Sequence, residues 1–550
     1  MLQSFARRLL SVLAVLLLVA LVVFMAPRLA PGDPTASTEP DAPLQAEPAP
    51  GKQSQPAVGP LLVQRLAPSL KLALLALGAS LAVGLPLGAL AAWRTGGWLA
   101  RGVGWLAWTG LALPVLALSF VLTGAAPAAS GSLPLWCLGT GGAALVARTT
   151  RAKLQVALAS NAVRNARALG LAEWRVLWRH ACLNAVRPIA AALARRLGLL
   201  ISGLVLVESI FAMPGLGSMA VDAALARDVP SLQALVLALG FVCALCAGAA
   251  GAPDPLPAAA QNSNARVRRS VAVRVGGGLL LLGLAIALLA PVVGLVDPAL
   301  SDPGSLNLRP GQVGSFTGPE GQAVQHRFWL GSDKSGRDLA SRVVHGARLS
   351  LFIGAASATL ALLVGGAIGL LAGVQRLLGS GLMRLMSALA AVPPLLLAMA
   401  VVALWRGGLA TVIVAVTLPA VPRVALRLRT WVAALRQAPH AEAALTQGTP
   451  GWLVLLRHVL PSTWVPLAAQ GVLIAAAAIV GEASLSFLGL GLPLDTPSWG
   501  QAMAEGRAQF GAMAHPVLIP ALCLTLLVLG LHLVADGLQR AYNAQQEMLR

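Results

Sequence analysis

The sequence predicts an all-α polytopic membrane protein with about twelve transmembrane helices, arranged as two six-helix repeats. Its 550 residues are 57% hydrophobic and only 11% charged, with a mean hydropathy of +0.78. Soluble proteins carry about 25% charged residues, so this composition excludes an ordinary soluble domain. The apolar residues form long runs, and one short polar motif occurs at matching places in both halves of the chain.

Transmembrane helices are predicted where an apolar run approaches the roughly 20 residues that cross a bilayer. In the first half these runs are 9–30, 70–92, 103–123, 133–149, 189–211 and 232–250. In the second half they are 275–296, 350–372, 382–404, 408–424, 464–485 and 516–536. The first run follows Arg7 and Arg8 as in a signal peptide, but it is longer than the apolar region of such signals, so a retained anchor is expected.

The net charge of +20 is explained by membrane topology. If the N-terminus lies inside, the inside segments contain far more Lys and Arg than Asp and Glu, whereas the outside segments are balanced. This distribution follows the positive-inside rule. We therefore expect both termini to be cytoplasmic, and the positive charge does not indicate a nucleic-acid partner.

Two halves are predicted at 1–250 and 275–550, joined by a cytoplasmic linker at 251–274 that is rich in Pro, Ala, Asn and Arg. The segment "VESIFAMPGLG" from Val207 pairs with "GEASLSFLGLG" from Gly481, with a Glu at the second position of each. Because each half has an even number of spans, both have the same orientation. They are parallel repeats about an axis along the membrane normal.

The repeated polar motif lies in the longest inside loop of each half, at 150–187 and 425–461. It is "GLAEWRVLWRH" from Gly170 and "GTPGWLVLLRH" from Gly448, with Gly, Trp, Val, Leu, Arg and His at identical spacings. Since Gly permits a break between helical segments, each loop should form two short helices at an angle. One such loop would suit an ordinary interfacial helix. Two in register indicate a docking element for two equal partners.

The second loop, "HAEAALTQG" followed by "RHVLP", resembles the coupling loop of binding-protein-dependent ABC importer permeases, whose pattern is E-A-A-x3-G. The first copy departs from this pattern, with Arg164 and Asn165 in place of Glu and Ala. The residues that we assign to contact with ATPase subunits, from the resemblance and the repeat, are Ala166, Gly170, Arg179, Glu442, Ala443, Ala444, Gly448 and Arg457.

Other segments resemble the two membrane subunits of dipeptide, oligopeptide and nickel permeases. "APRLAPGDP" and "VESIFAMPGLG" are similar to one subunit type, while "FWLGSDKSGRDLASRVVHGARLSL" and "PSWG" are similar to the other. The resemblance covers nearly the whole chain and implies that both types are joined in one polypeptide. It implies a permease of the bacterial inner membrane, two ATP-binding partner subunits and a periplasmic or extracellular solute-binding protein.

The sequence does not predict an enzyme. It contains no G-x-x-x-x-G-K-[ST] motif, and no inside segment is long enough for a nucleotide-binding domain. No cofactor or metal is expected in this chain, because ATP and Mg would be bound by the partner subunits. Cys243 and Cys246 form a C-x-x-C within an apolar run, which indicates helix packing.

Charged residues within or beside the spans are candidates for a substrate path, since a charge at the bilayer centre costs roughly 2.5–3.5 kcal/mol. Glu208 and Glu482 occupy matching places near the outer ends of two spans. They either meet a substrate amine or cap nearby backbone at the interface. Arg195 and Arg196 either face a substrate carboxylate or extend to the inner headgroups.

A polar cluster of His326, Asp333, Arg337 and Asp338 is expected in the long outer loop. It is interpreted either as structural turns or as a contact for the binding protein.

Two other classes of function stay open. A proton-coupled secondary transporter would use Glu208 and Glu482, but it leaves the repeated inside motif unexplained. A membrane scaffold without transport is the third alternative. The identity of the solute is not encoded in any motif of the sequence.

Overall fold

A computed structural model describes most of the chain. The described ranges are 58–93, 113–125, 131–194, 196–250, 271–289, 296–317, 323–374, 376–405, 408–436, 446–454, 460–493 and 495–548, with isolated positions between them. The expected span at 9–30 and most of the linker at 251–274 lie outside these ranges.

The first half is built around two long helices that approach closely. Its elements are α2 (Val58–Trp93), α4 (Val115–Ala125), α5 (Leu133–Leu158), α6 (Asn161–Ala168), α7 (Glu173–Arg175), the π-helical η2 (Val176–Cys182), α8 (Leu183–Ala194), α9 (Leu197–Ile210), α10 (Leu216–Leu225) and α11 (Val229–Ala250). A Cβ added at Gly84 or Gly88 of α2 would lie 2.7 or 2.6 Å from a carbonyl oxygen of α5. The small residues let the two backbones meet.

The second half repeats this arrangement. It contains α12 (Val271–Leu289), η3 (Pro303–Ser305), β1 (Val313–Thr317), β2 (Ala323–Arg327), α13 (Leu339–Val374), α14 (Arg376–Ala391), α15 (Pro394–Leu404), α16 (Leu409–Thr417), α17 (Val421–Arg436), α19 (Gly451–Val454), α20 (Leu460–Phe487), α21 (Trp499–Gly506), η5 (Arg507–Gln509) and α22 (His515–Met548). Gly365 and Gly369 of α13 approach carbonyl oxygens of α17 as the α2 glycines approach α5.

The described helices confirm a multi-pass all-α fold. Six are long and apolar enough to cross a membrane, or eight if two bent pairs each count as one span. These eight match the spans predicted at 70–92, 189–211, 232–250, 350–372, 382–404, 408–424, 464–485 and 516–536. The described parts of the spans predicted at 103–123 and 275–296 form short apolar helices, and 133–149 lies within α5.

Two predicted spans are bent, which corrects the expectation of single helices at 189–211 and 382–404. Helices α8 and α9 meet at 51°, and α14 and α15 meet at 96°. The sharper bend occurs at Pro393 and Pro394, because proline lacks the N–H that would continue a helix and disfavours helical backbone in the residue before it. The short helix α10 and the hairpin of β1 and β2 were not predicted.

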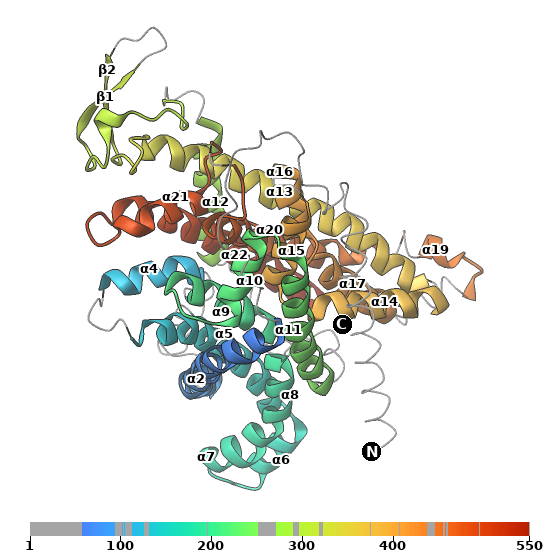
Figure 1. The fold of residues 1–550 in the computed structure, drawn as a ribbon. Coiled ribbons are helices and arrows are strands. Elements are labelled where there is room, and N and C mark those ends of the chain that lie inside the picture. The colour runs from blue at the N-terminus through green and yellow to red at the C-terminus, as the bar shows by residue number, and fades with distance from the viewer. Residues whose placement is uncertain are drawn as a thin grey trace.

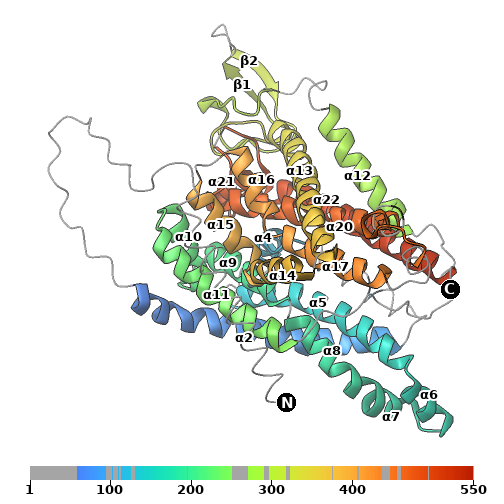
Figure 2. The same cartoon turned by 90° about the vertical axis from the view of Figure 1, so that its right-hand side faces the viewer.

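The two halves pack against each other over a shared apolar core. Buried side chains of the first half, such as Leu116 and Val205, belong to the same cluster as Leu396, Ile479 and Leu524 of the second. The antiparallel β1–β2 hairpin projects at one end of the molecule, and the α6–α7 segment projects at the opposite end (Figures 1 and 2). The contact surface of the two halves is called the seam below.

Candidate functional site

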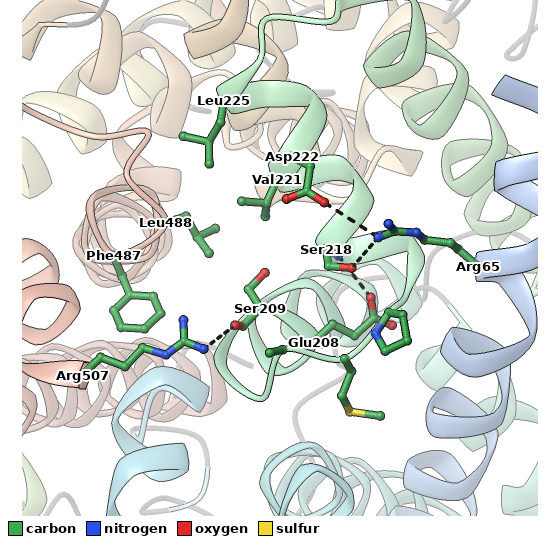
Figure 3. Close-up of a pocket in the computed structure, with 13 residues that line it drawn as sticks. Arg65, Glu208, Ser209, Ser218, Val221, Asp222, Leu225, Phe487, Leu488 and Arg507 are labelled. Carbon is green, nitrogen blue, oxygen red and sulfur yellow. Dashed lines mark hydrogen bonds and ion pairs between the residues drawn. The ribbon is translucent and has the colours of Figure 1, made fainter. Parts of the chain in front are cut away.

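A cavity of about 480 Å³ lies at the seam, between α2, α9 and α10 of the first half and the ends of α20 and η5 of the second. Figure 3 shows Arg65 and Asp222 on one wall and Phe487 and Arg507 on the other. Its volume lies within the range of about 300–1,000 Å³ that is typical of ligand pockets. The cavity is a candidate binding site because opposite charges and apolar side chains converge on it.

Glu208 ties three helices of the first half together beside this cavity. Its side chain is buried, and its Oε1 accepts a hydrogen bond of 2.6 Å from Ser69 Oγ of α2. Its Oε2 accepts the backbone N–H groups of Gly217 (2.7 Å) and Ser218 (3.3 Å) in the first turn of α10. The first N–H groups of a helix have no partner within the helix, and an anion there is favourable. Glu208 therefore caps α10.

Glu482 makes the matching connection in the second half through a serine. Its Oε1 accepts hydrogen bonds from Ser486 Oγ (2.8 Å) and Ser498 Oγ (2.6 Å). Ser498 precedes α21 and accepts the N–H of Gly500 at 3.2 Å. Glu482 Oε2 is buried without a hydrogen-bond partner in the described part of the chain. A path role for either glutamate stays a prediction.

Arg65 and Asp222 form an open ion pair on the wall of the cavity. Arg65 Nη1 lies 3.8 Å from Asp222 Oδ2 and donates to Ser218 Oγ at 3.3 Å. The Arg65 side chain is 31% exposed and that of Asp222 is 71% exposed. The pair is loosely held, so each partner is accessible to a molecule in the cavity (Figure 3).

A similar pair in the second half is closed. Arg342 Nη1 of α13 lies 2.6 Å from Glu505 Oε2 of α21, and it also contacts Asp333 Oδ2. The Arg342 side chain is 2% exposed and that of Glu505 is 9% exposed. Arg337 adds a second cation 3.7 Å from Glu505 Oε1. These charges form a buried cluster that fixes α21 against α13.

Two residues of the predicted outer polar cluster, Asp333 and Arg337, belong to this buried cluster of charges. Asp333 Oδ1 accepts the N–H groups of Ser335 and Arg337, which closes a tight turn. Asp338 Oδ2 accepts the N–H of Ser341 in the first turn of α13, and burial raises the pKa of the Asp338 carboxyl against the opposing effect of that N–H. These bonds favour the structural-turn alternative for Asp333 and Asp338.

Arg507 links the two halves at the hairpin end of the seam. Its Nη2 donates to the carbonyl oxygens of Ser209 (2.9 Å) and Ile210 (2.5 Å), the last residues of α9. A cation at the C-terminus of a helix satisfies free carbonyl groups and matches the helix dipole. A side chain of the second half therefore caps a helix of the first.

Other contacts cross the seam at both ends. Phe120 of α4 packs on Phe487 and Phe510 of the second half, with ring centroids 5.8 and 5.3 Å apart. At the other end, Arg148 of α5 lies 3.3 Å from Asp536 of α22. Side chains of the described residues therefore bridge the two halves at both ends of the seam.

The two predicted coupling loops share an unusual backbone conformation. Gly170, between α6 and α7, has φ +74°, and Gly448, before α19, has φ +82°. A Cβ added at either position would have no atom within 4 Å, so only backbone conformation favours glycine there. Ala166 is buried and Arg179 and Arg457 are exposed, while Glu442, Ala443 and Ala444 lie outside the described residues.

The first predicted coupling loop projects from the molecule (Figure 2), and several of its apolar side chains are exposed. Val163, Ala166 and Val176 are buried within the loop. Its exposed large apolar residues and those that follow in α8 are Leu169, Trp174, Trp178, Leu183 and Val186. Exposed apolar groups gathered on a projecting, basic loop indicate a contact with another molecule.

Of the two arginines proposed for the path, Arg196 is exposed at the bend between α8 and α9. Arg195 lies outside the described residues. Sequence analysis missed Arg65, Asp222 and Arg507. Each looks like an ordinary charge beside a span, and their partners are distant in the sequence.

Residues 84–250 and 365–546 each match the family described as "Binding-protein-dependent transport system inner membrane component". The chain is 37% identical over 283 residues to a probable peptide ABC transporter permease protein of Sinorhizobium fredii, covering 52% of this chain and 92% of the relative. It is 37% identical to a di/tripeptide transport system permease protein of Pseudomonas aeruginosa (48% and 86%). It is 36% identical to a glutathione transport system permease protein of Pectobacterium atrosepticum (41% and 74%).

The two matched regions begin at the equivalent glycines Gly84 and Gly365, which mark the close helix pair of each half. Each relative corresponds to about half of this chain. The chain therefore belongs to the family of inner membrane components of binding-protein-dependent transport systems, with two copies of the family domain fused in one polypeptide.

Proposed function

We propose that the chain is the membrane permease of an ATP-driven importer and forms the translocation path for short peptides or a related solute. The two coupling loops would dock two ATP-binding subunits, which bind ATP and Mg and drive the movement of the halves. The observation that carries the proposal is the repeated motif, whose glycine has positive φ in both loops. Two equal docking elements require two equal partners.

The seam supplies the path in this proposal. With the N-terminus in the cytoplasm, the β1–β2 hairpin faces the periplasm and the coupling loops face the cytoplasm. Arg507 and the Phe120 cluster then close the outer end, and Arg148 with Asp536 closes the inner end. Transport would open these contacts in turn, as a population shift between two packings of the halves.

A solute-binding protein would deliver the solute to the hairpin side. The family name and the names of the relatives support this partner and a peptide as solute. The proposal also includes the bacterial inner membrane as location, with both termini cytoplasmic.

Substitution of the loop glycines tests the proposal. Gly170→Val and Gly448→Val should each lower solute-stimulated ATP hydrolysis by about tenfold in a reconstituted complex, because a β-branched residue at positive φ costs about 1–3 kcal/mol and distorts the docking loop. Gly170→Asn and Gly448→Asn are the matched controls, since Asn tolerates positive φ, and they should retain most of the activity.

All variants are checked for membrane insertion and for a monodisperse profile in detergent. The proposal is wrong if both Val variants hydrolyse ATP and transport solute like the unmodified chain.

A further inference from the structure

The first half opens an ion pair to the cavity where the second half buries one. Arg65 with Asp222, and Arg342 with Glu505, each join the long helix of a half to its short helix, α10 or α21. The second pair is nearly inaccessible and is strengthened by Asp333. If the first pair served only to hold α10, Glu208 and Ser69 already provide that connection through four hydrogen bonds.

The open pair presents two opposite charges to one cavity. The nearest atoms of Arg65 and Asp222 are 3.8 Å apart, which is a weak contact for an exposed pair. Across the cavity lie the apolar side chains of Phe487 and Leu488 (Figure 3). Arg507, a second cation on the cavity wall, already donates to the carbonyl groups of Ser209 and Ile210. Arg65, Asp222 and the apolar surface therefore offer a cation, an anion and an apolar contact to the same ligand.

We propose that the cavity binds a short zwitterionic peptide, with Arg65 taking the C-terminal carboxylate and Asp222 the N-terminal ammonium group. The inference rests on the proposed function and names a solute subsite within the permease itself. The ion pair opens on binding, and each partner exchanges a weak contact for a terminus of the peptide. Side chains of the peptide contact the wall formed by Phe487 and Leu488.

The dimensions fit this class of ligand. An extended chain spans about 3.3–3.6 Å per residue, so two or three residues reach roughly 7–11 Å. The charged groups of Arg65 and Asp222 are now 3.8 Å apart, so these two side chains must move apart to meet both termini of such a peptide. A cavity of about 480 Å³ holds such a molecule. Guanidinium groups bind carboxylates with two parallel hydrogen bonds, which suits Arg65 to the terminal carboxylate.

Photolabelling tests the subsite directly. The full chain, with its ATPase subunits in nanodiscs and without nucleotide, is labelled with a tripeptide that carries a central benzoylphenylalanine. The label is mapped by mass spectrometry. Trialanine, its N-acetyl form and its C-terminal amide then compete for labelling. Free trialanine should compete at about tenfold lower concentration than either blocked form, since hydrogen bonds to charged groups have about this effect.

Substitutions test the roles of the two charged residues separately. Arg65→Gln should abolish the preference for trialanine over its amide and leave the preference over the N-acetyl form. Asp222→Asn should do the reverse. Arg65→Lys keeps the charge and should retain a preference over the amide, which controls for misfolding. Lys71→Gln, on an exposed part of α2 outside the cavity, should change neither preference.

The subsite is refuted if both preferences persist in Arg65→Gln and Asp222→Asn, or if the label maps away from the cavity walls. Because photolabelling needs no ATP, the subsite can fail while ATP-driven uptake persists. If the unmodified complex shows no ATP-driven uptake, the proposed function is refuted instead.

Discussion

The two halves connect equivalent pairs of helices, α2 with α10 and α13 with α21, by ion pairs of different character. In the second half Arg342 and Glu505 are buried, 2.6 Å apart and joined by Asp333. In the first half Arg65 and Asp222 are accessible, 3.8 Å apart and beside a cavity. A repeated fold has therefore kept a structural ion cluster on one side of the seam and an open charge pair on the other. This difference is the basis of our proposal that the ligand contacts the first half.

Unlike the two ion pairs, the two repeated glutamates have the same structural role in both halves. Glu208 caps α10 directly, whereas Glu482 acts on α21 through Ser498. Within the described residues, Glu208 uses both carboxylate oxygens in hydrogen bonds, whereas Glu482 uses one. The duplication therefore preserves the connection between the fifth span of each half and the short helix that follows it.

The largest effect should come from breaking the closed pair. Arg342→Gln leaves Asp333 and Glu505 as neighbouring buried carboxylates, and loss of one member of a buried ionic cluster costs about 3–5 kcal/mol. The loss of stability is measured by thermal unfolding in detergent and by the amount of protein that accumulates in the membrane. Arg65→Gln is the matched change in the open pair and should cost less than about 1 kcal/mol. Equal losses in the two variants would remove the distinction between the pairs.

A smaller effect should distinguish the two glutamates. Glu208→Gln replaces one of two accepting oxygens by a donor beside the N–H groups of α10, with an expected cost of about 1–3 kcal/mol. Glu482→Gln retains the accepting oxygen and should be nearly neutral, because Glu482 Oε2 has no partner in the described residues. The two variants are compared by their midpoints of thermal unfolding. A larger loss in Glu482→Gln would contradict the capping geometry.

The smallest effect should come from the cap across the seam. Arg507→Gln removes a cation from the end of α9, which is worth about 0.3–1 kcal/mol. The outer end should then open more readily and raise ATP hydrolysis without binding protein by up to about fivefold. Arg507→Lys, which keeps the charge, should stay near the unmodified rate. An unchanged rate in Arg507→Gln would show that this contact does not hold the seam closed.

The fold was predictable where a local pattern determines it. Long apolar runs located most spans, and the repeated motif located both halves. The bend at Pro393 could have been found from the Pro-Pro pair, but the apolar run hides it. The α10 helix was missed because it is short and its start depends on Glu208 of another helix.

The site was only partly predictable for a similar reason. Glu208 and Glu482 were singled out by burial cost and repetition, and backbone capping was one of the two alternatives considered. Arg65 and Arg507 find their partners on distant segments of the chain. No spacing within a single sequence encodes such pairings, so the charged wall of the cavity appears only in the folded structure.

The most direct test of the central claim is peptide uptake into proteoliposomes that contain the chain, its two ATP-binding subunits and the solute-binding protein. We expect uptake of radiolabelled tripeptide to require ATP inside, the ATP-binding subunits and the binding protein, and to be unaffected by a protonophore. Uptake by the chain alone, driven by a pH gradient without ATP, would contradict the account and support a proton-coupled transporter.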